Sequence, residues 1–99
     1  AGTKYLAFLR GRYFSGEEMD ELNKDLFSFA AYNAGPRRVT QLRSGASEMG
    51  LDPNQWFDNV EEVAAKRIGR ETVQYVANIY KYFIAYARIL AEREKKGRL

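Results

Sequence analysis

In every segment with clear periodicity, apolar residues recur three and four positions apart instead of alternating with polar ones. This spacing is typical of helices and leaves no candidate strand. The pattern therefore predicts an all-α fold of about five to six helices. The first helix carries its apolar face on Tyr5, Leu6, Leu9 and Tyr13.

Capping signals divide the next part of the chain. Ser15 and Glu18 have the spacing of a capping box, which predicts that a second helix begins there and ends at Gly35. A proline follows at once, and proline suits a first helical position because the N–H it lacks would have no partner there. A third helix is therefore predicted over residues 36–43, followed by a loop over residues 44–51.

Two more start signals follow at short intervals. Residues 52–55 predict a short turn that carries Trp56, and Asn59 with Glu62 predicts a helix that ends near Gly69. Caps this close together indicate short helices that meet at an angle.

The longest apolar pattern lies in the last third of the chain, where two adjacent rows make a wide face. A helix that is wet on one side needs only about 100° of apolar arc. The wider face predicts a long central helix with others packed around it. The rows are Val73, Val76, Tyr80, Phe83, Ala87 and Leu90, and Tyr75, Ile79, Tyr82, Tyr86 and Ile89.

Composition agrees with one globular domain over residues 1–99, or a part of one, because 45% of residues are hydrophobic and 29% are charged. A net charge of +3 allows an anionic partner without requiring one. The chain has no Cys and no His, so we expect no disulfide, no metal site, no cofactor and no histidine-based catalysis. Neither a signal peptide nor a membrane span is predicted.

One interpretation of residues 20–44 is a helix-turn-helix DNA reader. Arg37, Arg38 and Arg43 would lie on its second helix, and Ala31 with Gly35 fits its small-residue spacing. Any two packed helices need a small residue at their corner, however, and +3 is a small charge for binding nucleic acid. A DNA-binding or protein-interaction module is therefore kept as the alternative, and no nucleic acid is expected.

Three segments in order resemble the C-terminal half of the lytic transglycosylase catalytic domain, above all that of the membrane-bound lytic murein transglycosylases of bacteria. They are residues 31–36 (Ala-Tyr-Asn-Ala-Gly-Pro), 56–61 and 68–79, and residues 2–6 look like the family helix that precedes them. The resemblance implies a lysozyme-like helical fold and a bacterial cell-envelope location. It also implies peptidoglycan glycan strands as the partner.

In that family, a single Glu protonates the glycosidic oxygen between N-acetylmuramic acid and N-acetylglucosamine, and a 1,6-anhydro product forms without water. The resemblance implies that Tyr32 and Asn33 contact the sugar and that Tyr75 lies near the catalytic carboxyl. Glu71 would support them at a helix start. Judged singly, each residue fits a structural role better, Tyr32 in a core, Asn33 at a helix end and Glu71 in a first turn, and only the three together in family order favour the sugar cleft.

Two departures from the family pattern limit the implied function. Arg37 stands where the family commonly has a small residue, and a guanidinium there could meet carboxylates of the peptidoglycan stem peptides. The Glu-Ser pair that carries the general acid occurs nowhere in the sequence. We therefore expect a fragment that has no catalytic residue, is inactive alone, and leaves the aromatic face of residues 73–90 uncovered for self-association.

Overall fold

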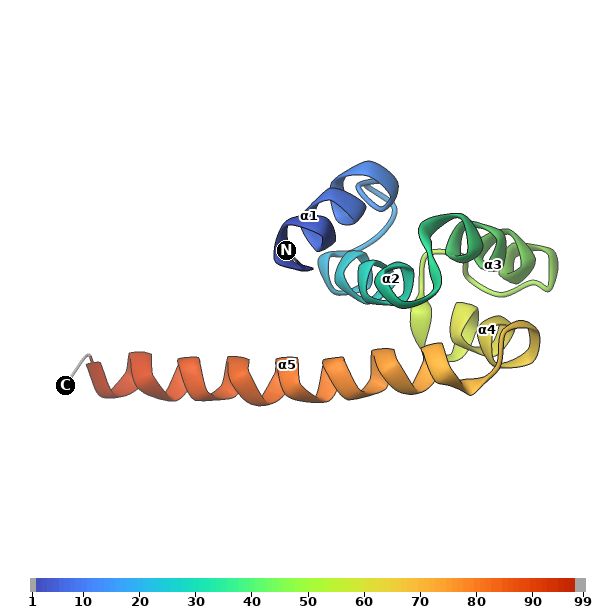
Figure 1. Ribbon diagram of the computed structural model, residues 1–99. Helices are drawn as coiled ribbons and strands as arrows, with labels where there is room; N and C mark the ends of the chain where they lie inside the picture. Colours follow the sequence, from blue (N-terminus) through green and yellow to red (C-terminus); the bar gives the residue numbers. More distant parts are fainter. Residues whose placement is uncertain (1, 98–99) are drawn as a thin grey trace.

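The computed structural model describes residues 2–97, and its side chains from residue 4 to residue 95 (Figure 1). These residues form five α-helices and one short π-type turn, with no strand among them, so the predicted all-α class and helix number are confirmed. The elements are α1 (Gly2–Tyr13), α2 (Glu21–Ala34), α3 (Pro36–Glu48), η1 (Trp56–Val60), α4 (Glu61–Arg67) and α5 (Arg70–Gly97).

Aromatic rings from three segments form the centre of the core. Phe14 follows α1 and stacks on Phe27 of α2 with 5.8 Å between ring centroids, and Trp56 meets the edge of Phe27 at the same distance. All three side chains are fully buried. They are surrounded by aliphatic residues from every element, chiefly Leu9, Leu26, Val39, Leu42, Val60, Val63 and Val76.

The second helix does not begin with the predicted capping box at Ser15 and Glu18. It begins at Glu21, because the side chain of Asp20 accepts a hydrogen bond of 2.8 Å from the backbone N–H of Asn23. A carboxylate in this position satisfies one of the free amides of the first turn.

Asn23 is a buried polar residue that joins α2 to η1. Its Nδ2 donates to Asp20 at 2.9 Å and to Gln55 at 3.1 Å, and its Oδ1 accepts from the backbone N–H of Trp56 at 2.8 Å. These bonds link the cap of α2 to the segment that carries the central tryptophan. Tertiary contacts therefore favour Asp20 over Ser15 as the residue that caps α2.

The third helix is longer than predicted, and most of the expected loop over residues 44–51 is helical. Gly45 and Ala46 are buried, and a Cβ on Gly45 would lie 2.6 Å from the guanidinium of Arg67. The helix ends at Glu48 and is followed by a left-handed glycine, Gly50, with a bond of 2.8 Å from the N–H of Leu51 to the carbonyl of Ala46. Small residues here serve close packing.

The start of α4 also differs from the prediction. Glu61, not Glu62, reaches back, and its Oε1 accepts from the N–H of Asp58 at 3.1 Å. The side chain of Asn59 instead accepts from the N–H of Asp52 at 2.9 Å and so ties the preceding turn together. The helix ends at Arg67, close to the predicted end near Gly69.

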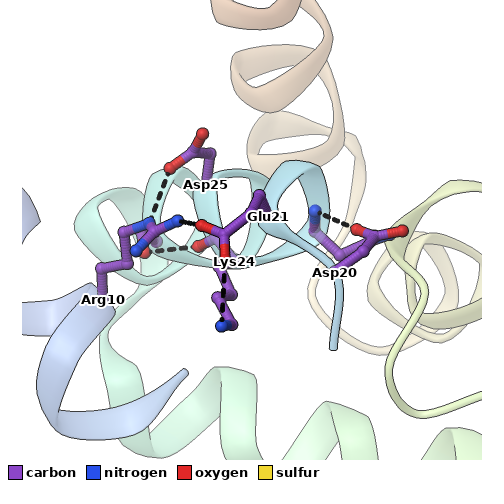
Figure 2. Close-up of polar contacts among 7 residues, drawn as sticks. Arg10, Asp20, Glu21, Lys24 and Asp25 are labelled. Atoms are coloured by element: carbon purple, nitrogen blue, oxygen red, sulfur yellow. Dashed lines mark hydrogen bonds and ion pairs between the residues drawn. The ribbon is translucent and has the colours of Figure 1, made fainter. Parts of the chain in front are cut away.

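Ion pairs hold α1 against α2, as Figure 2 shows. The guanidinium of Arg10 contacts Glu21, and its Nε donates to Asp25 at 2.9 Å. Lys24 also contacts Glu21, at 3.3 Å. Because Arg10 pairs with the first two turns of α2, the N-terminal end of α1 lies beside the last turn of that helix.

The last helix is long, as predicted, but other helices cover only its first part. Thr72 and Val76 are buried, and Tyr80 meets Phe57 edge-on at 5.1 Å between centroids. From residue 81 to residue 95 every side chain is exposed, and Figure 1 shows this half of α5 extending beyond α4 and α2. The prediction that other helices pack around the whole of this helix is therefore correct only for its first three turns.

Candidate functional site

The predicted sugar-contact residues lie at the corner between α2 and α3. The chain turns at Gly35, whose φ of 98° favours glycine, and its N–H closes α2 by donating to Ala31 at 2.8 Å. Pro36 then begins α3. This corner places Tyr32 and Asn33 on the last turn of α2, as the sequence predicted.

Asn33 is held by a contact with Thr72, a residue that no sequence motif singled out. The hydroxyl Oγ1 of Thr72, on the first turn of α5, donates to Asn33 Oδ1 at 2.7 Å. Among the described residues the amide Nδ2 of Asn33 has no partner, and the residue is exposed. The bond occupies the side-chain carbonyl of Asn33 and leaves the two N–H donors of the amide available for a further hydrogen bond.

Tyr75 lies one helical turn beyond Thr72 and so on the same face of α5. Its side chain is half-buried, and burial raises the pKa of its phenol, with a smaller contribution from nearby Tyr32. The phenol therefore stays protonated at neutral pH and can donate a hydrogen bond. The structure thus brings Tyr32, Asn33 and Tyr75 to one place.

Tyr32 is an exposed residue and not the core aromatic that was its alternative. It is 43% exposed, and its ring centroid lies 5.9 Å from that of Tyr5 on α1. Tyr5 was expected on the apolar face of its helix and is itself 45% exposed. Tyrosines from α1 and α2 thus meet at the surface on the last turn of α2, and they offer apolar ring faces with hydroxyls at their edges.

Glu71 is exposed at the start of α5, and no hydrogen bond or ion pair of its side chain is found in the described part of the chain. Its supporting role therefore stays a prediction. Its neighbour Thr72 makes the contact that supports Asn33. Helical spacing could have found Thr72, because it lies three residues before Tyr75, whereas only the packing of α1 on α2 places Tyr5 here.

An open hollow of about 790 Å³ adjoins the same corner. Arg37 and Arg38 are exposed beside it, and neither Tyr32 nor Asn33 nor Tyr75 lines it. The hollow is therefore a neighbour of the tyrosine cluster and not the same site. It is lined by Tyr13, Ala34, Gly35, Pro36, Arg37, Arg38, Thr40 and Gln41.

The third arginine of the DNA-reading alternative is engaged elsewhere. Arg43 is half-buried, with its guanidinium carbon 5.4 Å from the ring centroid of Phe27 and 6.0 Å from that of Phe14. It also donates to the carbonyl of Pro53 at 2.9 Å and to the side chain of Asn54 at 2.8 Å. Arg43 therefore stabilises the core and is not free to contact phosphate.

Carboxylates that could approach a metal ion come together at one place in the described chain. Oxygens of Asp58, Glu61 and Glu62 lie within 4.8 Å of one another at the start of α4. Acidic residues in a first turn are favourable without an ion, and Glu61 already bonds to the backbone there. This cluster indicates no metal site, and the expectation of no metal or cofactor stays a prediction.

The chain is similar to bacterial proteins named membrane-bound lytic murein transglycosylase F. The protein of Pseudomonas fluorescens strain Pf-5 is 30% identical over 95 aligned residues, which cover 83% of this chain and 19% of the relative. Those of Desulfosudis oleivorans and Marinobacter nauticus are 33% and 30% identical over 84% and 89% of this chain, or 21% and 20% of the relatives. The chain thus spans about a fifth of their length.

No family model and no solved structure matches the chain. Within residues 2–97, no helix has both the length and the apolar character needed to cross a bilayer.

Proposed function

This chain is homologous to one segment of the membrane-bound lytic murein transglycosylase F family, and we propose that it forms one wall of a peptidoglycan-binding cleft. Tyr32, Asn33 and Tyr75 are the residues that contact the glycan strand. The parent protein would cleave the bond between N-acetylmuramic acid and N-acetylglucosamine without water, giving a 1,6-anhydro end, in the bacterial cell envelope.

The observation that carries this proposal is the hydrogen bond from Thr72 to Asn33. An amide whose carbonyl is occupied presents N–H donors, and the carbonyl of an N-acetyl group is an acceptor that fits them. The phenol of Tyr75, one helical turn after Thr72, adds a donor on the same face of α5, and the exposed ring of Tyr32 adds an apolar face on which a sugar ring can lie.

The chain carries the proposed glycan-binding residues but lacks the residue that would cleave the glycan. The chemistry requires a general acid to protonate the leaving oxygen, and the Glu-Ser pair that supplies it in the family is absent from these 99 residues. We infer that the chain holds the glycan and does not cleave it. Murein sacculi incubated with the chain alone should release no anhydromuropeptides.

A chimaera tests the function of the wall. In the Pseudomonas fluorescens relative, the segment matched by this chain is replaced with residues of this chain, and anhydromuropeptide release is measured by mass spectrometry. Tyr32→Phe combined with Asn33→Ala should lower the rate by about tenfold or more, because a positioned donor and a sugar contact are lost. The exposed Glu48→Gln is the matched control. A double variant as fast as the control would show that these residues are not the sugar contacts.

The alternative function, DNA binding, is tested by a separate measurement. Binding of the chain to duplex DNA that weakens steeply with salt, and weakens further in Arg37→Ala and Arg38→Ala, would favour it. Our proposal predicts no such binding, since Arg43 lies against the core rings of Phe14 and Phe27 and donates to Pro53 and Asn54.

A further inference from the structure

Three aromatic rings form a continuous row on the surface of α1 and α2. Phe8 stacks on Tyr5 with 6.3 Å between centroids and 14° between ring planes, and Tyr5 meets Tyr32 at 5.9 Å. The exposed fractions are 55% for Phe8, 45% for Tyr5 and 43% for Tyr32. Single exposed aromatics are common on protein surfaces, but a group of three neighbouring rings that ends at Tyr32, next to Asn33 in the chain, is not explained in that way.

The row is held in place by the helix beneath it. Leu9, next to Phe8, is fully buried in the core. Arg10 pairs with Glu21 and Asp25 of α2. The helix α1 is therefore held both by a buried leucine and by ion pairs. The rings of Tyr5 and Phe8 are therefore presented on a rigid element, which lowers the ordering cost of binding.

We propose that Phe8 and Tyr5 form a second sugar-stacking subsite that continues from the one at Tyr32 and Asn33. Its ligand is the apolar face of the next pyranose ring along a glycan strand. This inference rests on the proposed function and extends it, because the added subsite makes the chain prefer longer glycans to short ones. Stacking on aromatic faces gives such an affinity gain without requiring charge.

The test is a titration of the isotope-labelled 99-residue chain with N-acetylglucosamine oligomers of two and of five sugars, followed by nuclear magnetic resonance. The wild-type chain should bind the five-sugar oligomer about three- to tenfold more tightly than the two-sugar oligomer. Phe8→Leu and Tyr5→Leu keep apolar volume but remove the ring, and they should reduce this preference to less than about twofold. Tyr82→Leu, on the far half of α5, is the control and should keep it.

The outcomes separate the two proposals. If Tyr32→Leu weakens binding of both oligomers while Phe8→Leu and Tyr5→Leu keep the preference for five sugars, the second subsite is wrong and the proposed function stands. If the wild-type chain binds neither oligomer, both proposals are contradicted. Circular dichroism of each variant shows that its helices are retained, and Phe8→Tyr, which restores a ring, should restore the preference.

Discussion

The hydroxyl of Thr72 donates a hydrogen bond of 2.7 Å to the side-chain carbonyl of Asn33, a residue 39 positions earlier in the chain. The bond joins the first turn of α5 to the last turn of α2. Thr72 is buried and Asn33 is exposed, so a buried residue sets the direction of a surface amide. In our account this is the contact that prepares the glycan site.

Replacing Thr72 with valine removes the hydroxyl and keeps the shape. We expect a loss of about 1 kcal/mol in the free energy of unfolding and a several-fold weaker affinity for N-acetylglucosamine oligomers. Thr72→Ser should restore the affinity, because it keeps the donor. Thr40→Val, which removes an exposed hydroxyl bonded to the Pro36 carbonyl, is the control for general effects. Unchanged glycan affinity in Thr72→Val would contradict the positioning role.

Asn23 is predicted to matter for stability and not for binding. Asn23→Ala leaves the buried N–H of Trp56 without its partner and removes the bonds to Asp20 and Gln55. We expect a loss of about 2–3 kcal/mol in urea unfolding. The exposed Asn78→Ala is the control, since its side chain bonds only to Gln74 among the described residues. Equal stabilities of the two variants would show that the network is unimportant.

The stability of the domain should fall in acid. The pKa of Asp20 is lowered by the N–H of Asn23, and the pKa of Glu21 is lowered by its bond from Arg10. A carboxylate whose pKa is lower when folded stabilises the fold above its unfolded pKa, and this contribution is lost as the pH falls through the folded value. The melting temperature should therefore decline below about pH 4.5, close to the ordinary value for a Glu.

A double variant tests whether Asp20 and Glu21, and not other carboxylates, cause the loss of stability in acid. Asn caps a helix without titrating, so Asp20→Asn combined with Glu21→Gln should have a melting temperature that varies less with pH between about 4.5 and 2. The comparison is with Glu17→Gln combined with Glu48→Gln, two exposed residues, which removes the same number of charges and keeps the bonds of Asp20 and Glu21 in place. An acid dependence that is the same in both double variants would contradict the assignment.

The outer half of α5 should cause self-association of the isolated chain. Tyr82 and Tyr86 are 74% and 64% exposed, and apolar neighbours Phe83, Ile89 and Leu90 are also exposed. Lys81 and Arg88 are seven residues apart and so lie on one side of the helix, which leaves an apolar side that a second copy can cover.

Sedimentation measures this directly. The wild-type chain should show a concentration-dependent rise in mass, and Tyr82→Glu combined with Tyr86→Glu should shift it to monomer. Lys81→Glu changes a charge on the polar side and should leave the association in place. A wild-type chain that is monomeric at every concentration measured would show that this face is not a contact between copies.

Local signals predicted the corner of the site but not all of its contacts. Gly35 and Pro36 have a conformational preference that needs no tertiary context, so the end of α2 and the start of α3 were predicted correctly. Ser15 and Asp20 both fit a helix start, and only the buried network around Asn23 favours Asp20. The local sequence does not decide where a helix begins when several neighbouring residues could serve as its N-cap.

Two other features depend on packing. The segment with Gly45 was expected to be a loop, yet it is helical, with Gly45 and Ala46 buried and the guanidinium of Arg67 packed beside the glycine. Tyr5 was expected on the apolar face of the first helix, and its place beside Tyr32 follows only from the pairing of α1 with α2. Sequence periodicity does not show which neighbour a helix face meets.

The most direct test of the central claim is the map of residues that respond when the labelled 99-residue chain is titrated with a soluble N-acetylglucosamine–N-acetylmuramic acid oligosaccharide. Our account predicts saturable shifts at Tyr32, Tyr75 and the side-chain amide of Asn33. Shifts centred on Arg37 and Arg38, or no saturable shift anywhere, would contradict it.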